Sequence, residues 1–410
     1  MNEKLRMDGE AIAGAAIAAV KPDAAVRRAL GEMTFPGRVF LVAAGKAAWQ
    51  MAKTAVEVLP QPLEGGIVVT KYGHVLGEIP GVRCVEAGHP VPDGNSFRGT
   101  AAVLEMTAGL LPTDTVLFLL SGGGSALFEQ PLVPPEELQA VTHRLLAAGA
   151  DIVEMNTVRK RLSAVKGGRF ALHCAPARVE AVVLSDILGD PLDMIASGPA
   201  AADPSTAQQA VAIAKKYHLP LSGRGWELLE QETPKALDNV RTQVIGSVRE
   251  LCRAAADACS QLGYRPVLLT DRMDGEAREV GRFLAAILAA HAGDGEKLAF
   301  LAGGETVVHL TGDGLGGRNQ ELALAAARGI AELPNAALIS VGSDGTDGPT
   351  DAAGGYVDGD TLGELLAKGI DLDRTLGDND AYHALQAVGG LVMTGPTGTN
   401  VNDVAVALLG

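Results

Sequence analysis

Two glycine-containing turns, each directly after a short apolar run, hold residues that could bind an anion. One is Ala44-Gly45-Lys46-Ala47, and the other places Gly122, Gly123 and Gly124 between Ser121 and Ser125. The backbone N–H groups of such strand-to-helix turns favour phosphate or carboxylate, and lysine or serine side chains add further donors. A solvated lysine and an ordinary tight loop are the alternatives for the two turns. The second turn is not a Walker A loop, because it lacks the GxxxxGK[ST] pattern.

One concentration of basic residues stands out in this acidic chain, at residues 156–169, and it includes Asn156, Arg159 and Lys160. A guanidinium presents several donors in a planar fork, so this segment could recognise a carboxylate or a phosphate. A solvated helix face would contain the same residues. His89 stands before Pro90, and we interpret a histidine in a proline-flanked turn as structural.

Carboxylates supply the complementary chemistry. Asp186 and Asp190 lie four residues apart after an apolar run, so one could act as a general base while the other holds a metal ion. Aspartates that cap a turn would look the same. Glu305, Arg318 and Asp344 lie in later glycine-rich turns, where the GxGxxG match at residues 312–317 is a weak signal. Because the HExxH and GxSxG motifs are absent, hydrolases that use them are excluded.

These turns are positioned by short apolar runs that alternate with Ala- and Leu-rich helical patterns. This alternation is typical of parallel or mixed sheets flanked by helices, and in such sheets ligands bind beyond the carboxyl ends of the strands. In the first half we expect strands at 39–44, 66–70, 115–120 and 179–184, and helices at 47–59, 96–110, 135–148 and 152–162. The sequence therefore predicts an α/β fold whose turns carry the chemistry.

A polar, proline-containing stretch at 231–239 separates this alternation from a second one. We therefore expect two domains, 1–235 and 236–410, each with its own sheet. In the second, strands are expected at 242–245, 264–269, 298–302, 306–310, 336–342 and 390–394, and helices at 247–262, 277–291 and 319–330.

Composition excludes several classes of protein. The 410 residues are 47% hydrophobic and 20% charged, which is typical of a folded globular chain. A net charge of −15 without a strongly basic stretch argues against nucleic-acid binding, and no apolar stretch is long enough to span a membrane. The four cysteines lack zinc or disulfide spacing, so we expect them to be reduced and the protein to be cytoplasmic.

Taken together, the turns resemble those of the glycerate 2-kinases whose C-terminal part is called a MOFRL domain, and the resemblance covers nearly the whole chain. The motifs that carry it are residues 44–47, 88–93, 120–126, 156–160, 166–168 and 184–190, followed by 303–306, 316–321, 343–348 and 397–403.

The resemblance implies an N-terminal Rossmann-like domain and a C-terminal MOFRL-type domain, with an active site in the cleft between them. It also implies ATP-dependent phosphorylation of D-glycerate at its 2-hydroxyl with Mg²⁺, and Lys46, Asp186 and Arg318 as the catalytic residues. An aspartate that accepts the hydroxyl proton and two cations that neutralise the transferred phosphoryl group make a reasonable set.

Roles for the remaining residues are hypotheses. We expect the turn Ser121–Ser125 to cradle the triphosphate, and Asn156, Arg159 and Lys160 to hold the glycerate carboxylate. Asp190, Glu305 and Asp344 are the expected direct or water-mediated Mg²⁺ ligands. We also expect the two domains to close on the substrates, and the chain to form a homodimer.

Two other functions compete with the kinase. One is a nicotinamide-dependent hydroxypyruvate reductase, which is disfavoured because the Rossmann fingerprint with its ribose-binding acid is missing. The other is a ligand-sensing module, which would not need a general base.

Overall fold

The computed structural model describes residues 2–185, 187, 189–293 and 295–410. The chain divides into two compact units: Ala25–Ile245, here called the N-terminal unit, and Met1–Ala24 with Gly246–Gly410, here called the C-terminal unit. This division differs from the domains predicted at 1–235 and 236–410, chiefly because the first helix, α1 (Glu3–Ala19), joins the later unit. Its Gly9 lies against Ile339, since a Cβ there would be 3.3 Å from that side chain.

The N-terminal unit is built on a six-stranded sheet with the order β3-β2-β1-β4-β5-β6. The strands are β1 (Val39–Ala44), β2 (Gly65–Lys71), β3 (Val82–Ala87), β4 (Thr115–Leu120), β5 (Arg178–Leu184) and β6 (Val240–Gly246). Strands β1 to β5 pair in parallel, and β1 and β4 are buried along their whole length. The strand order reverses direction between β1 and β4, which is the point where open α/β sheets bind ligands.

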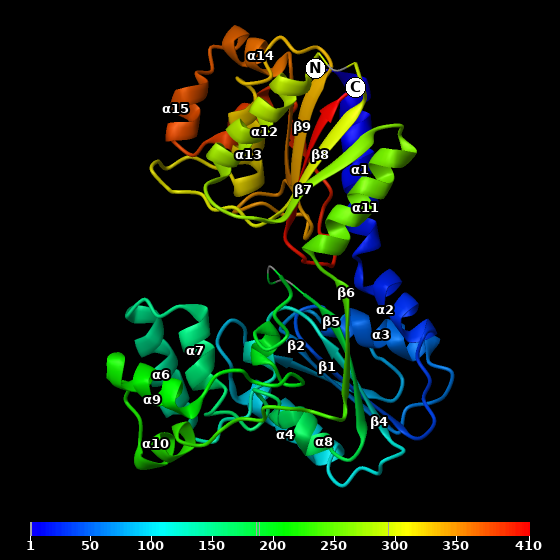
Figure 1. Ribbon diagram of the computed structural model, residues 1–410, viewed down its shortest axis with the longest axis vertical. Helices are drawn as coiled ribbons and strands as arrows, with labels where there is room; N and C mark the ends of the chain where they lie inside the picture. Colours follow the sequence, from blue (N-terminus) through cyan, green and yellow to red (C-terminus); the bar gives the residue numbers. More distant parts are fainter. Residues whose placement is uncertain (1, 186, 188, 294) are drawn as a thin grey trace. The chain divides into compact units, whose positions relative to one another are not determined.

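Helices cover this sheet and also form a separate cluster. The helices are α2 (Pro22–Gly31), α3 (Ala48–Val58), α4 (Gly94–Met106), α5 (Gly124–Leu127), α6 (Pro135–Ala147), α7 (Ile152–Arg159), α8 (Arg169–Cys174), α9 (Ala207–Lys216), α10 (Gly223–Leu229) and the 3₁₀ turn η1 (Ile195–Ser197). Phe118, Phe128 and Phe170 pack in the core on one face of the sheet, with ring centroids 4.9 to 5.5 Å apart. Helices α6, α7, α9 and α10 enclose a second, smaller core beside it (Figure 1).

The C-terminal unit contains a mixed sheet with the order β11-β10-β9-β12-β8-β7. Its strands are β7 (Arg265–Met273), β8 (Leu298–Gly304), β9 (Ala336–Gly342), β10 (Gly354–Asp358), β11 (Leu391–Val392) and β12 (Asp403–Leu409). β12 runs antiparallel to both of its neighbours, β8 and β9, whereas β7 and β8 are parallel. The prediction of two α/β domains with mostly parallel or mixed sheets is confirmed.

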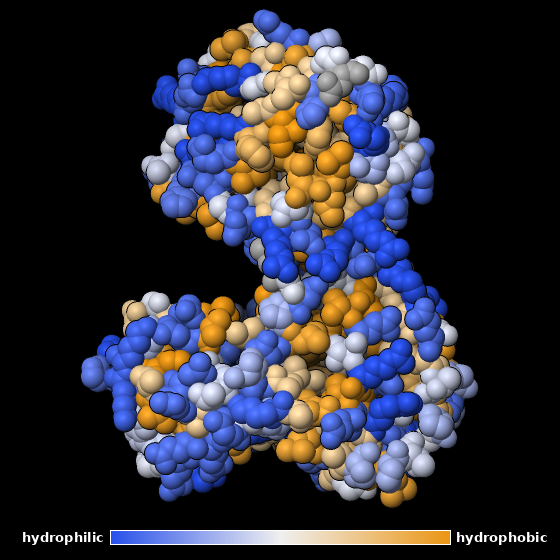
Figure 2. Space-filling model, viewed as in Figure 1, coloured by the Kyte–Doolittle hydropathy of each residue, from blue (hydrophilic) through white to orange (hydrophobic). Residues whose placement is uncertain are grey.

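Helices lie on both faces of the second sheet. They are α11 (Val248–Gln261), α12 (Ala277–His291), α13 (Arg318–Ala326), α14 (Thr361–Ala367), α15 (Leu372–Gly377) and α16 (Ala381–Ala387). α1 packs beside α11 on one face, and α12 packs beside α13 on the other (Figure 1). Apolar side chains gather at the surface of this unit around the edge strand β7, where Leu268 and Leu269 are exposed (Figure 2).

One predicted strand of this unit is wrong. Residues 306–310 form only an isolated bridge between Glu276 and Val307, and the side chains of Val307 and Leu310 are exposed. The place beside β8 is taken instead by β12, a strand from the far end of the chain that we did not predict. An apolar run in the sequence predicts that a segment is buried. It does not predict which of two apolar segments pairs with β8.

Within the described residues, no helix is both long and apolar enough to cross a bilayer.

Candidate active site

The turns after β1 and β4 meet at the carboxyl edge of the first sheet. The backbone N–H of Lys46 donates to the carbonyl of Gly122 at 2.8 Å, and the N–H of Ser121 donates to the carbonyl of Ala44 at 3.0 Å. The hydroxyl of Ser121 accepts a hydrogen bond from the N–H of Ala47 at 3.1 Å. Ala47 and Ser121 are 74 residues apart in the sequence. The loop of Lys46 and the glycine-serine turn thus form one structure at the point where the strand order reverses.

Close approach of the two turns requires glycine at position 45. Gly45 has a φ of 126°, and a Cβ atom there would lie 2.2 Å from the hydroxyl oxygen of Ser121. Any larger residue would push the two turns apart. The single glycine in Ala44-Gly45-Lys46-Ala47 is therefore explained by packing between turns, which the sequence alone did not indicate.

Ser125 connects the glycine-serine turn to the predicted carboxylate-binding segment. Its hydroxyl lies 3.0 Å from the hydroxyl of Ser197, which in turn donates to the Asn156 side chain at 2.9 Å. Arg159 reaches the same turn, where Nη2 donates to the carbonyl of Ser125 at 3.2 Å. Asn156 and Arg159 thus lie at the Ser125 end of the turn.

Lys166 holds the same carbonyl from inside the protein. Its ammonium is completely buried and donates to the carbonyls of Ser125 at 2.8 Å and Phe128 at 3.1 Å, and it forms an ion pair with the buried Glu129 at 3.2 Å. Burial lowers the pKa of Lys166 to about 8, although Glu129 opposes the shift. Lys166 lies in the motif at residues 166–168, and its contacts show that it fixes the backbone of the turn.

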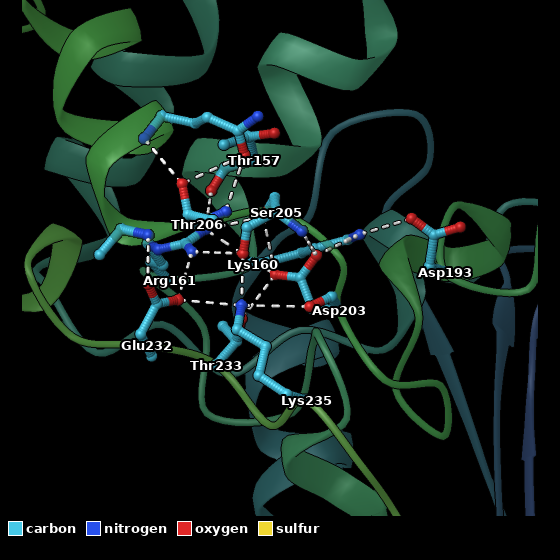
Figure 3. Close-up of polar contacts among 12 residues, drawn as sticks. Thr157, Lys160, Arg161, Asp193, Asp203, Ser205, Thr206, Glu232, Thr233 and Lys235 are labelled. Carbon is cyan, nitrogen blue, oxygen red and sulfur yellow. Dashed lines mark hydrogen bonds and ion pairs between the residues drawn. The ribbon is translucent and has the colours of Figure 1, made fainter.

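Lys160 has different surroundings from Asn156 and Arg159, although it is close to them in the sequence. Its ammonium lies 3.1 Å from Asp193 and 3.1 Å from Asp203, and the residue is 1% exposed (Figure 3). Asp203 also accepts from the hydroxyl of Thr233 at 2.7 Å and from that of Ser205 at 2.9 Å. The charge of Lys160 is therefore balanced within the protein by carboxylates from the segment that follows β5.

The two aspartates predicted after β5 have different outcomes. Asp186 lies outside the described residues. Asp190 is half-buried with a φ of 52°, and its Oδ1 is buried without a hydrogen-bond partner among the described residues. That atom has an unused capacity to accept a hydrogen bond or to bind a cation.

In the C-terminal unit, Arg318 begins α13 and is held by two acids. Its Nε and Nη2 donate to Asp403 at 2.5 and 2.9 Å, and Nη1 lies 3.2 Å from Glu305. Burial opposes the charge of Arg318, but the hydrogen bonds to Asp403 and the negative charges of Asp403, Glu305 and Asp347 together raise the pKa of the guanidinium above its usual value. Asp403 and Glu305 are brought together because Asp403, at the start of β12, pairs with Gly304, at the end of β8.

Asp347, which lies in the motif at residues 343–348, caps the same helix. Its two carboxylate oxygens accept from the backbone N–H groups of Asn319 at 3.1 Å and Gln320 at 2.9 Å. Burial raises the pKa of Asp347 to about 6. Asp344 lies close by, since its Oδ1 and that of Asp403 would both be 3.4 Å from a Cβ atom on Gly342.

The predicted metal ligands are divided between the units: Asp190 belongs to the N-terminal unit, and Glu305 and Asp344 belong to the C-terminal unit. The part of the chain that the structure describes contains no group of three His, Cys, Asp or Glu side chains arranged to hold a metal ion. Mg²⁺ commonly keeps several waters and takes only one or two protein carboxylates beside substrate phosphates. The unpartnered Oδ1 of Asp190 fits that mode of binding.

Comparison with known proteins defines the class of the chain. Residues 8–230 match the family described as a domain of unknown function (DUF4147), and residues 298–403 match the MOFRL family. The chain is therefore a two-part DUF4147–MOFRL protein.

Relatives define the family more narrowly. A D-glycerate 2-kinase from Thermotoga maritima is 52% identical over 96% of this chain and 95% of its own length, and a glycerate 2-kinase from Pyrococcus horikoshii is 39% identical over 99% and 97%. The crystal structure of a glycerate kinase from Thermotoga maritima superimposes with a TM-score of 0.97, at 50% identity and with complete coverage of both chains. This chain belongs to the glycerate kinase family, as the motif resemblance predicted.

Proposed function

We propose that this chain transfers the γ-phosphoryl group of ATP to the 2-hydroxyl of D-glycerate, giving 2-phosphoglycerate and ADP. The observation that carries the proposal is its 52% identity, along almost its whole length, to a D-glycerate 2-kinase. The geometry supports it, because Lys46 and a serine-flanked glycine turn meet where the strand order reverses. Phosphoryl transfer depends mainly on positioning and on neutralising charge, which this arrangement can provide.

In this proposal the turn Ser121–Ser125 holds the triphosphate, while Lys46 and Arg318 neutralise charge on the transferred group. Asp403 and Glu305 keep the guanidinium of Arg318 oriented. Asp186 accepts the proton of the 2-hydroxyl. Asn156 and Arg159 hold the glycerate carboxylate, and Lys160 supports them by fixing the segment after β5 through Asp193. Domain closure and a homodimer remain predictions.

Mg²⁺, when bound, would neutralise the phosphate oxygens of ATP. Asp190 is the predicted ligand of the N-terminal unit, and its Oδ1 has no hydrogen-bond partner among the described residues. Glu305 and Asp344 are the weaker assignments, because Glu305 already pairs with Arg318 and Asp344 accepts hydrogen bonds from Thr346.

A hydroxypyruvate reductase is the second candidate, because the strand order β3-β2-β1-β4-β5-β6 is also that of dinucleotide-binding folds. In those folds the glycine-rich fingerprint follows the first strand. Here β1 is followed by Gly45 and Lys46, and the GxGxxG match at 312–317 lies in the other unit. The kinase is therefore the better supported function.

An assay with enolase tests the proposal. The purified protein is supplied with ATP, Mg²⁺ and D-glycerate, and enolase is added without phosphoglycerate mutase, so that only 2-phosphoglycerate yields phosphoenolpyruvate. We expect phosphoenolpyruvate to form. Release of ADP without it would move the acceptor away from the 2-hydroxyl, and oxidation of NADH with hydroxypyruvate in place of ATP turnover would establish the reductase.

Lys46→Met tests the role of the lysine in the same assay. We expect kcat to fall by at least about 100-fold, because a group that stabilises transition-state charge is worth a few kcal/mol. Lys215→Met, at an exposed lysine in α9 of the same unit, is the control and should behave like the wild type. A Lys46→Met protein with normal kcat would contradict the assignment.

A further inference from the structure

The loop after β3 brings His89 to the glycine-serine turn. A Cβ atom on Gly123 would lie 2.9 Å from Cδ2 and 3.0 Å from Nε2 of the imidazole, and 3.3 Å from Cγ of Lys46. Gly123 has a φ of 84°. Histidine and lysine thus approach the same glycine from two different loops, and the imidazole turns its Nε2 edge toward the turn.

Both side chains are half-buried, and neither terminal group has a partner among the described residues. No hydrogen bond to the His89 ring or to the ammonium of Lys46 comes from any residue that the structure describes. The carbonyl of Lys46, by contrast, is engaged by Nδ1 of His74 at 2.9 Å. A half-buried donor without a protein partner is available to a ligand.

The surroundings of His89 are positively charged. The pKa of His89 is lowered, first by burial and then by Lys46, which follows β1, by Lys71, which ends β2, and by His74. The lowered pKa favours the neutral imidazole, which lies beside the lysines Lys46 and Lys71 in a chain whose net charge is −15. A polyanion is the ligand that such a group of loops would attract.

We infer that His89 binds the polyphosphate of the nucleotide, with Nε2–H donating to a phosphate oxygen beside Lys46 and Gly123. The inference rests on the proposed function, and it replaces our interpretation of His89 as structural. The polyphosphate is favoured over the glycerate carboxylate because Asn156 and Arg159 lie at the Ser125 end of the turn, whereas the loop of Lys46 joins the turn at Ser121 and Gly122.

The test is calorimetric binding of ATP and of inorganic triphosphate to the full chain, without glycerate. His89→Ala should weaken the affinity for both ligands by about tenfold or more, as expected for the loss of a hydrogen bond to a charged group. His89→Gln should lie within about threefold of the wild type, because its longer side chain can place an amide donor near the Nε2 position. His89→Asn should resemble His89→Ala. His143→Ala, at an exposed histidine in α6, is the matched control.

Unchanged triphosphate affinity in His89→Ala would overturn the inference. So would equal losses in His89→Gln and His89→Asn, since a purely structural histidine would not distinguish them. If His89→Ala does not fold, the difference in triphosphate affinity between His89→Gln and His89→Asn still tests the inference. A raised KM for glycerate with normal triphosphate binding would assign the imidazole to the other substrate and contradict the proposal. Binding is measured here without turnover, so the two tests are independent. The role of His89 can be contradicted while the kinase assay succeeds, and it can be supported while the kinase assay fails.

Discussion

At the scale of single residues, neighbours in one basic segment have separate tasks. Arg159 and Lys166 both donate to the carbonyl of Ser125, whereas Lys160 is paired with Asp193 and Asp203. Buried cations must find partners, because an unpaired buried charge is costly. The identity of the partner depends on segments that are 30 to 45 residues away. The sequence therefore indicated a cluster of cations, and it could not indicate which of them is free to bind substrate.

Asp347 leads to a prediction about pH. Its pKa is about 6 in the folded chain and near 4 when unfolded, so the folded state binds its proton more tightly. The stability that this group contributes is complete below about pH 4 and is lost as the pH rises toward 6, by roughly 3 kcal/mol at most. Asp347→Asn keeps a side-chain oxygen at the cap and removes the titration. We expect its free energy of unfolding to decline less than that of the wild type between pH 4 and 6.

Denaturant titrations of both proteins across this range would measure the difference. Parallel pH profiles would show that Asp347 does not titrate there.

At the scale of elements, the site depends on contact between two turns that end β1 and β4. Each turn was predicted from its own sequence, and the register of two parallel strands places them together. Our interpretation of His89 as structural came from its local turn alone, because its loop follows a different strand, β3, and nothing local indicates that it reaches Gly123. A histidine near a glycine-rich turn becomes visible as a functional residue only after the strand order is known.

Gly45→Ala tests this contact. The new methyl group would collide with the hydroxyl of Ser121, so we expect kcat/KM to fall by at least about 100-fold as the turns separate. Gly149→Ala is the matched control, since Gly149 also has a positive φ of 71° but has open space around its Cβ position. Both substitutions place a Cβ atom on a residue with positive φ, which costs roughly 1–3 kcal/mol of backbone strain. Equal activity of the two variants would show that the Gly45 contact is unimportant.

At the scale of the whole molecule, the sequence predicted two α/β units and most of their strands. It did not predict that α1 belongs to the C-terminal unit. Amphipathic patterning shows that a helix has a buried side, and it does not show which element packs against that side. In the structure α1 packs on α11 and β9, and Tyr264 donates to Asp8 at 2.8 Å. The missed β12 has the same cause, since its place between β8 and β9 is decided by tertiary pairing.

Ile12→Ala tests the assignment of α1. Ile12 is fully buried, so we expect a loss of about 2–4 kcal/mol in the free energy of unfolding of the C-terminal unit. Hydrogen exchange should become faster in α11, β9 and β12 and stay unchanged in β1 and β4. Ile152→Ala, at an exposed position that begins α7, is the control. Faster exchange in β1 and β4 would place α1 with the other unit.

The position of α1 also has a consequence for synthesis on the ribosome. The helix is made before the N-terminal unit, and the strands that it covers, β9 and β12, are made only after that unit. The N-terminal unit is continuous in sequence and can fold as soon as it has left the exit tunnel, whereas the apolar side of α1 stays without its partner throughout that time. The nascent chain therefore exposes the apolar side of α1 to solvent until β9 and β12 have been made. A chaperone that binds short apolar helices would bind the nascent chain at α1.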